Sequence, residues 1–78
     1  MPKVEIEYCA AWGYESQAVS MTDKILNEFK QDIETYTLIP SDGGRFEITV
    51  NGELVFSKLK EKRFPEYDEI HPQIRNFL

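Results

Sequence analysis

The first residues of the chain alternate between apolar and charged side chains. Val4, Ile6 and Tyr8 are each separated by one charged residue. A period of two is typical of a β-strand that buries one of its faces. The sequence therefore predicts a first strand that ends at Cys9, followed by a glycine-containing loop over residues 10–14.

From about Glu15 to Lys30 the apolar residues recur at steps of three and four. This spacing places them on one face of an α-helix and predicts an amphipathic helix. The acidic Glu15 near the start and the basic Lys30 near the end suit the helix dipole. The expected inward-facing residues are Ala18, Met21 or Thr22, Ile25, Leu26 and Phe29.

Two strands are predicted next. Residues 33–39 are rich in β-branched and aromatic side chains, which favour a second strand, and residues 40–44 have the composition of a loop. Phe46, Ile48 and Val50 then alternate with polar residues as a third strand. Gly43 and Gly44 lack the flanking residues of a phosphate-binding loop, so we interpret the 40–44 segment as a turn.

Asn51-Gly52 is the strongest hairpin signal in the chain, because both positions tolerate the positive φ of a type I′ turn. Residues 53–59 are predicted to return as a fourth strand. A closing helix is predicted over about 68–78, with Pro72 leaving two alternatives: either the helix begins near His71, or Pro72 bends it. Its expected buried residues are Ile70, Ile74 and Phe77.

The predicted order is β-α-β-β-β-α within a single domain, residues 1–78. A helix between the first two strands implies a right-handed crossover and parallel pairing, whereas the hairpin pairs the last two strands antiparallel. The fold class expected is therefore α/β (α+β), a four-stranded mixed sheet with two helices on one face, in a reduced thioredoxin-like arrangement. Pro40 is expected to follow a trans peptide bond, the statistical default.

Composition narrows the classes of partner. The chain has 78 residues, 41% of them hydrophobic, and a formal net charge of -5; the charge argues against a nucleic-acid partner, which would need a basic stripe. A local basic cluster is interpreted as a solvated strand end and loop, and consists of Lys58, Lys60, Lys62 and Arg63.

The number of cysteines and the hydropathy of the chain indicate in which cellular compartment the protein is expected. A single cysteine allows no intramolecular disulfide framework, and no apolar run is long enough for a bilayer span or resembles a signal peptide. We therefore expect a cytoplasmic protein with no membrane partner. The single histidine, His71, is expected at the surface or at a cap, and a lone histidine with scattered carboxylates predicts no metal site.

Cys9 is the candidate reactive residue because of its position. It ends a predicted strand just before a helix, whose N-terminal N–H groups and positive potential stabilise a thiolate. The alternative is that Cys9 is an inert, small, buried side chain, as a lone cysteine in a small domain often is.

Three segments of the sequence resemble the selenoprotein W-like (Rdx) family. Residues 8–14, Tyr-Cys-Ala-Ala-Trp-Gly-Tyr, resemble its redox loop, in which a cysteine and two small residues precede selenocysteine or cysteine. Residues 44–58 resemble its central hairpin, and residues 63–65 the lead into its last helix.

The resemblance implies a thioredoxin-like fold and a thiol or selenol redox function. It implies no tightly bound cofactor, with glutathione as the reductant and either glutathione or a redox protein as the partner. By position, Cys9 matches the first redox residue, and Trp12 occupies the place of the selenocysteine or cysteine. An indole cannot form the disulfide or selenenylsulfide of that cycle, so the chain as written is inactive or acts through one thiol.

Three explanations of Trp12 stay open. Trp12 stands where selenocysteine stands in the natural protein, since UGA and the tryptophan codon UGG differ by one base. Alternatively, Cys9 acts alone and forms mixed disulfides with glutathione or a partner. The third is a non-enzymatic protein-binding module, with Trp12, Tyr14 and Phe64 as an exposed aromatic patch, unless these rings simply pack the core.

Overall fold

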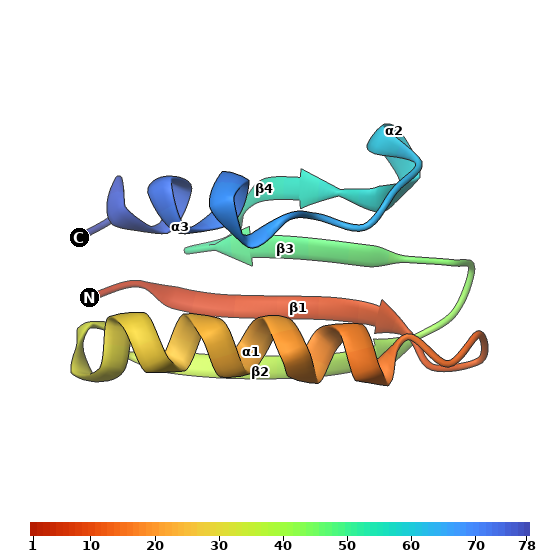
Figure 1. Ribbon diagram of the computed structural model, residues 1–78, viewed down its shortest axis with the longest axis horizontal. Helices are drawn as coiled ribbons and strands as arrows, with labels where there is room; N and C mark the ends of the chain where they lie inside the picture. Colours follow the sequence, from red (N-terminus) through yellow and green to blue (C-terminus); the bar gives the residue numbers. More distant parts are fainter.

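The computed structural model describes all of residues 1–78, and a β-sheet lies at its centre (Figure 1). A long helix links the first two strands, and two shorter helices follow the last strand. The elements in chain order are β1 (Lys3–Cys9), α1 (Glu15–Phe29), the 3-10 helix η1 (Lys30–Asp32), β2 (Thr35–Ser41), β3 (Phe46–Val50), β4 (Glu53–Ser57), α2 (Lys58–Glu61) and α3 (Tyr67–Arg75).

The sheet has the strand order β2-β1-β3-β4. β1 pairs parallel with β2, as a crossover through α1 requires, and antiparallel with β3. β3 pairs antiparallel with β4 through a turn in which Asn51 has φ 54° and Gly52 has φ 80°. Both values are those of a type I′ turn. The predicted mixed four-stranded sheet and its hairpin are confirmed.

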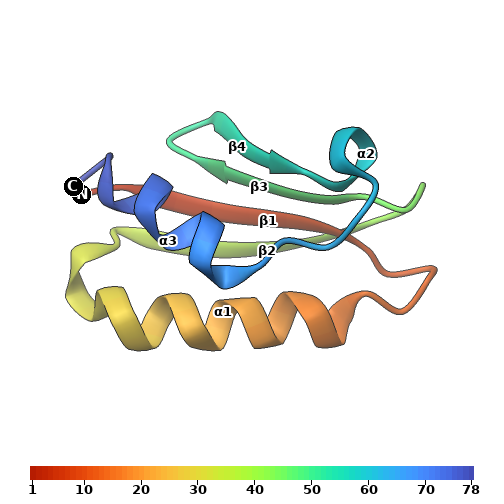
Figure 2. The same ribbon diagram turned by 45° about the horizontal axis from the view of Figure 1, so that its top comes forward.

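One hydrophobic core fills the space between the sheet and the helices. Because side chains alternate along a strand, β1 and β3 each send every second residue into it. The buried residues of α1 and α3 join the same cluster, so both helices cover one face of the sheet, as expected; Figure 2 shows α1 running along it. The cluster consists of Val4, Ile6, Ala18, Met21, Ile25, Phe29, Phe46, Ile48, Val50, Phe56, Ile70 and Ile74.

Two strand boundaries differ from the sequence prediction. β2 begins at Thr35 and continues through Pro40 to Ser41, because the register with β1 pairs Ser41 with Cys9. The peptide bond before Pro40 is trans, as expected. β4 ends at Ser57 rather than at residue 59, because Ser57 caps a new helix: its Oγ accepts a hydrogen bond from the Lys60 N–H.

The closing helix begins before His71, so the alternative in which it starts near His71 is wrong. It starts at Tyr67, because a capping box joins the Glu66 side chain to the backbone of Glu69 and the Glu69 side chain to the backbone of Glu66. Pro72 lies inside this helix, which ends at Arg75, so Phe77 is only half-buried. On α1, Leu26 is exposed and Met21 takes the buried position that the sequence left open between Met21 and Thr22.

Candidate functional site

The residues of the resemblance converge at one end of the sheet. β1 and β2 run parallel and end there at Cys9 and Ser41, and β3 begins there at Phe46. The segment 9–14, which we call the Cys9 loop, leaves β1 at this end and leads into α1 (Figure 1). The topology therefore places Cys9 between a sheet end and a helix start, as the sequence indicated.

Backbone hydrogen bonds fix the Cys9 loop on three sides. The Tyr14 N–H donates to the Cys9 carbonyl at 3.1 Å and so closes the turn. The Cys9 N–H donates to the Arg45 carbonyl at 2.8 Å, and the Ala10 N–H donates to the Ser41 carbonyl at 2.9 Å. These bonds satisfy polar groups that would otherwise be left unpaired beside the buried thiol, and they anchor the loop to both neighbouring segments.

Cys9 and Trp12 differ sharply in exposure. Cys9 is 0% exposed and belongs to no part of the hydrophobic core cluster, whereas Trp12 is 64% exposed. The Trp12 side chain therefore meets solvent and any incoming molecule, whereas the Cys9 side chain is shielded from both. The two predicted site residues thus sit in one loop but in opposite environments.

The indole of Trp12 lies against the backbone of Gly44, in the turn between β2 and β3. A Cβ atom at Gly44 would stand 2.5 Å from Cζ3 of Trp12, so only glycine leaves room for the ring. Gly44 also has φ +74°, a conformation that other residues rarely adopt. The other side of the ring is open, apart from an edge contact with Tyr14 at 6.2 Å between centroids.

Tyr14 and Phe64 join the loop to the core. Their rings meet edge to face with centroids 4.8 Å apart, and Phe64 meets Phe46 in the same way at 5.3 Å. Both Tyr14 and Phe64 are half-buried against the core cluster. The aromatic patch expected from the sequence therefore reduces to one exposed ring, Trp12, supported by two packing rings.

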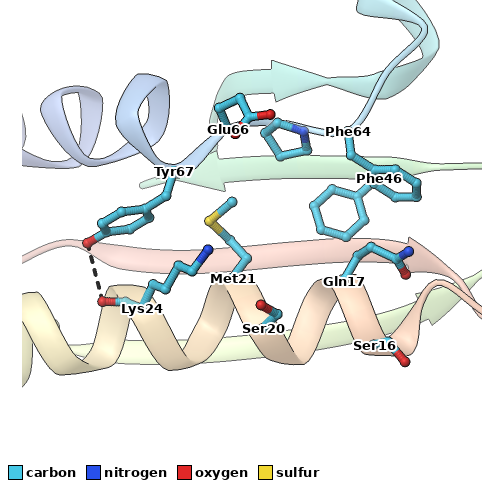
Figure 3. A pocket seen from close by; sticks show the side chains of 10 residues that line it. Ser16, Gln17, Ser20, Met21, Lys24, Phe46, Phe64, Glu66 and Tyr67 are labelled. Atoms are coloured by element: carbon cyan, nitrogen blue, oxygen red, sulfur yellow. Dashed lines mark hydrogen bonds between the residues drawn. The ribbon is translucent and has the colours of Figure 1, made fainter.

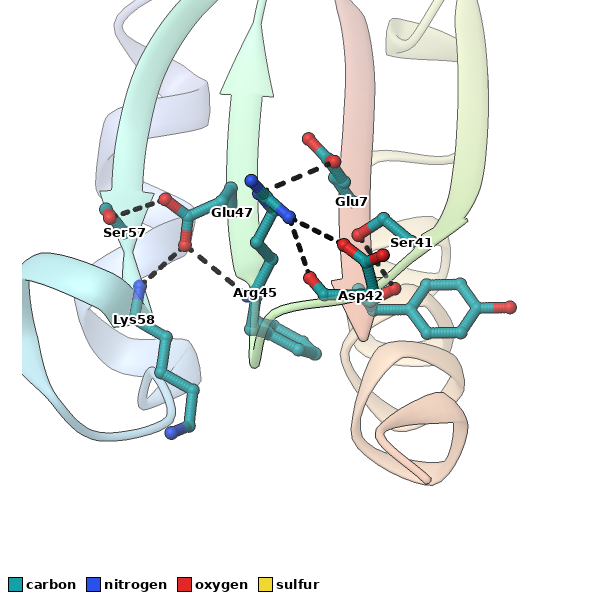
Figure 4. A network of polar contacts seen from close by, with 9 residues as sticks. Glu7, Ser41, Asp42, Arg45, Glu47, Ser57 and Lys58 are labelled. Atoms are coloured by element: carbon teal, nitrogen blue, oxygen red, sulfur yellow. Dashed lines mark hydrogen bonds and ion pairs between the residues drawn. The ribbon is translucent and has the colours of Figure 1, made fainter. Parts of the chain in front are cut away.

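A polar network surrounds the same end of the sheet on the face away from α1 (Figure 4). The Arg45 guanidinium donates to the Asp42 carboxylate at 3.0 Å and to the Asp42 carbonyl at 2.8 Å, which braces the turn that holds Gly44. Its Nε also lies 3.9 Å from Glu7. Sequence reasoning missed the contact with Glu7 because it joins segments that are far apart in the chain.

Glu47 forms the second half of this network. Its carboxylate accepts hydrogen bonds from the Ser57 hydroxyl and, at 2.9 Å, from the backbone N–H of Lys58, the first residue of α2 (Figure 4). A carboxylate at a helix start compensates the unpaired N–H groups there. Glu47 on β3 therefore stabilises the start of α2 together with the Ser57 cap.

A cleft of about 240 Å³ opens beside the loop, between α1 and the segment that leads into α3 (Figure 3). Phe64 and Phe46 form one wall, and at the far end the hydroxyl oxygen of Tyr67 lies 3.2 Å from the Lys24 carbonyl oxygen. The remaining lining residues are Ser16, Gln17, Ser20, Met21, Pro65 and Glu66.

His71 lies away from the Cys9 loop, on α3 beside the last turns of α1. Its side chain is half-buried: it stays partly exposed, as a surface residue would, but its Nδ1 is buried without a hydrogen-bond partner, 4.0 Å from the Glu28 carboxylate. Tyr67 and Arg75 both donate to Glu28. The Tyr67 bond, with lesser help from Arg75, lowers the pKa of Glu28, whereas burial and the Glu28 carboxylate raise the pKa of Tyr67.

Two further findings concern metals and membranes. Histidine, cysteine and acidic side chains form no group of three or more that could hold a metal ion. None of the helices combines the length and apolar character needed to cross a bilayer.

Known proteins resemble this chain over almost its full length. Selenoprotein W of Danio rerio is 34% identical over 67 residues, which are 85% of this chain and 78% of the relative. Migration and invasion enhancer 1 of Mus musculus is 33% identical over 72 residues, 92% of this chain, but the chain spans only 61% of that relative's length.

A solved structure agrees with the sequence comparisons. The selenoprotein W-related protein from Vibrio cholerae superposes with a TM-score of 0.92 at 30% identity, over 97% of this chain and 95% of the other. The family model described as the Rdx family matches residues 3–76, the whole sheet and its helices. The resemblance drawn from the loop and the hairpin is confirmed: the chain belongs to the Rdx family.

Proposed function

We propose that this domain is a thiol redox protein of the selenoprotein W type, with glutathione as its reductant, and that Trp12 stands at the position of a selenocysteine. Membership of the Rdx family supports a redox-related role. The observation that carries the finer proposal is the pairing of a buried Cys9 with an exposed position 12 in one short, anchored loop.

We infer different roles for the two positions. An exposed selenolate or thiolate at position 12 attacks an oxidised sulfur of the substrate and releases one substrate thiolate. The Cys9 thiolate then attacks the mixed bond, releases the second substrate sulfur and closes a bond between positions 9 and 12. Two molecules of glutathione return two electrons and two protons and leave as glutathione disulfide.

The burial of Cys9 weighs against a reaction of this thiol alone. Glutathione would have to reach a side chain that is 0% exposed, which requires the Cys9 loop to open first. The same burial suits a resolving thiol, which needs to meet only its neighbour in the loop. A reducing compartment such as the cytoplasm keeps this thiol in the reduced form, and we propose that location.

The Trp12→Cys substitution tests the proposed pair. We expect oxidised glutathione to convert this variant to a form lighter by two hydrogens, with an internal disulfide that reduced glutathione reverses. Cys9→Ser added to Trp12→Cys should leave a stable glutathione adduct at position 12 instead, because the resolving thiol is gone. A Trp12→Cys protein that keeps two free thiols at equilibrium with oxidised glutathione would contradict the proposal.

The native codon for residue 12 tests the origin of Trp12 separately. UGA with a selenocysteine insertion element supports the proposal, whereas UGG without such an element contradicts it. In that second case the exposure of Trp12 favours the alternative function, a protein-binding module on the same fold.

A further inference from the structure

The cleft between α1 and the segment that leads into α3 takes no part in the proposed redox cycle (Figure 3). Its volume is about 240 Å³, and side chains of α1, of β3 and of residues 64–67 line it together. Clefts that hold drug-sized ligands usually measure about 300–1,000 Å³. This hollow therefore suits a smaller molecule, such as a single aromatic ring with its substituents.

One edge of the cleft is a polar row along α1. Ser16, Ser20 and Lys24 follow one another at steps of four residues, so their side chains lie on the same side of the helix. All three residues are exposed. Each serine hydroxyl can donate and accept a hydrogen bond, whereas the lysine ammonium can only donate. The row therefore offers polar contacts along the cleft and a positive charge at one end of it.

The wall opposite this row is apolar. Phe46 and Phe64 pack edge to face with ring centroids 5.3 Å apart, and Pro65 extends the wall past Phe64. The thioether of Met21 points into the same space (Figure 3). A hydrocarbon or aromatic group that entered here would leave water for an apolar surface, which favours its binding.

Lys24 is the only cation that lines the cleft. Figure 3 shows its ammonium group reaching over the cleft toward Met21, and Tyr67 lies at the same end. Lys24 takes part in no ion pair. An unpaired ammonium group beside an apolar wall favours a ligand that has both an anionic head and an apolar body.

The carboxylates around the cleft are already engaged. Glu66 is the only one that lines it, and its side chain accepts the Glu69 N–H as part of the capping box. The Glu69 carboxylate pairs with Arg63 at 2.6 Å, and the Glu28 carboxylate pairs with Arg75. The lysine is therefore the one charged group of the cleft without a partner, and a ligand carboxylate would supply that partner.

We propose that this cleft binds a small amphipathic carboxylic acid, with its carboxylate on Lys24 and its apolar body against Phe46 and Phe64. The hydroxyls of Ser16 and Ser20 match a further polar group, such as an amide, between the two ends of the ligand. A protein segment fits less well, because a stable protein interface takes about 800 Å² from each partner and this site is one small hollow.

This inference goes beyond the proposed function and does not depend on the thiol reaction. The cleft nevertheless adjoins the Cys9 loop, because the ring of Phe64 in its wall packs on Tyr14 with centroids 4.8 Å apart. An acid bound in the cleft would therefore touch a side chain that supports the loop.

A titration followed by NMR of the backbone amides tests the proposal on the intact domain. The probe is N-acetylphenylalanine, which joins a ring, an amide and a carboxylate. We expect saturable binding at about 1 mM, with the largest signal changes at residues 16–24 and 64–67. The neutral N-acetylphenylalaninamide should bind about threefold to fivefold more weakly, because it lacks the charge that pairs with Lys24.

Substitutions separate the charge from the cavity. Lys24→Gln should weaken binding of the acid about threefold to fivefold and leave binding of the amide unchanged. Lys60→Gln is the matched control: Lys60 is exposed, forms no ion pair and lies outside the cleft, so this variant should bind both probes like the unaltered domain. Ser20→Leu should weaken both probes, because the larger side chain takes up space in the cleft.

Three results would overturn the proposal. The first is no saturable change at residues 16–24 and 64–67, and the second is equal weakening of acid binding by Lys24→Gln and Lys60→Gln. The third is tighter binding of the blocked peptide acetyl-Gly-Phe-Gly-amide than of the acid, which would assign the cleft to a protein segment. The redox proposal is judged separately, because disulfide formation in Trp12→Cys needs neither Lys24 nor Ser20. Failed acid binding with retained disulfide formation contradicts this inference alone, and the reverse contradicts the redox proposal alone.

Discussion

The indole of Trp12 packs directly against Gly44: a β-carbon at residue 44 would lie only 2.5 Å from its Cζ3 atom, too close for any residue but glycine. The contact joins the Cys9 loop to the turn between β2 and β3, two segments that are far apart in the sequence. It also means that the turn leaves open space beside position 12 only when the side chain there is small. A cysteine or selenocysteine at position 12 would uncover the backbone of Gly44 to an approaching substrate.

Gly44→Ala should destabilise the domain for two reasons, the positive φ and the clash with Trp12. Together we expect a loss of about 1–3 kcal/mol in the free energy of unfolding, with a shift in Trp12 emission. Gly52→Ala is the matched control, because φ is +80° there and no atom lies within 4 Å of an added Cβ. Its expected cost is about 1–2 kcal/mol, from backbone conformation alone.

A double-mutant cycle separates the two reasons at Gly44. In a Trp12→Ser background the clash is absent, so Gly44→Ala should cost about as much as Gly52→Ala in urea unfolding. An unchanged cost of Gly44→Ala in that background would show that the indole does not occupy the space above the glycine.

The thiol of Cys9 should react slowly in the folded protein. Since its side chain is 0% exposed, an aromatic disulfide reagent has to wait for local opening of the Cys9 loop. We expect the rate at which Cys9 reacts with this reagent to rise steeply with urea, at urea concentrations still below the unfolding midpoint. A native rate close to that of the unfolded chain would contradict the buried position and would restore the case for a reaction through Cys9 alone.

Local sequence patterns could predict what local physics decides. The alternation of Val4, Ile6 and Tyr8 marks a half-buried strand in any sheet, and Asn51-Gly52 specifies its turn through backbone preferences alone. The position of Cys9 between a strand and a helix followed from these patterns. Assigning the chain to the Rdx family required, in addition to these patterns, the particular residues of the loop and hairpin.

Contacts between distant segments were beyond such patterns. The last residues of the predicted fourth strand form α2, whose start is stabilised by Glu47 on the neighbouring strand through bonds to Ser57 and to the Lys58 N–H. Sequence spacing carries no sign of this contact. The same holds for the indole over Gly44 and for His71, which packs beside Glu28 through the meeting of α1 and α3.

Glu47→Gln should loosen α2 while the sheet stays folded. A neutral amide loses the charge that compensates the helix start and replaces one strong acceptor by a donor, at an expected cost of about 1–2 kcal/mol. The amide of Lys58 should therefore exchange its hydrogen with solvent faster. Hydrogen exchange followed by NMR measures this change. Glu5→Gln, on the same sheet face, changes an exposed carboxylate that accepts only a 3.4 Å bond from Thr49 and should have little effect.

The start of α3 should make stability depend on acid pH. The hydrogen bond from Arg63, followed by the backbone N–H of Glu66, lowers the pKa of Glu69 to about 2. Because the pKa is lower in the folded than in the unfolded chain, the carboxylate stabilises the fold fully above about pH 4.5. That contribution is lost progressively as the pH falls toward 2.

The size of this contribution is modest, because the Arg63–Glu69 pair is partly solvent-exposed. We expect Glu69→Gln to cost about 0.5–1 kcal/mol at pH 7, and the difference from the unaltered domain to vanish near pH 2. Urea unfolding at several pH values between 7 and 2 measures both. Glu53→Gln, on an exposed residue of β4 with no ion pair, serves as the control and should show no such convergence. A Glu69→Gln deficit that persists at pH 2 would show that the side-chain amide disturbs the helix start by packing rather than by charge.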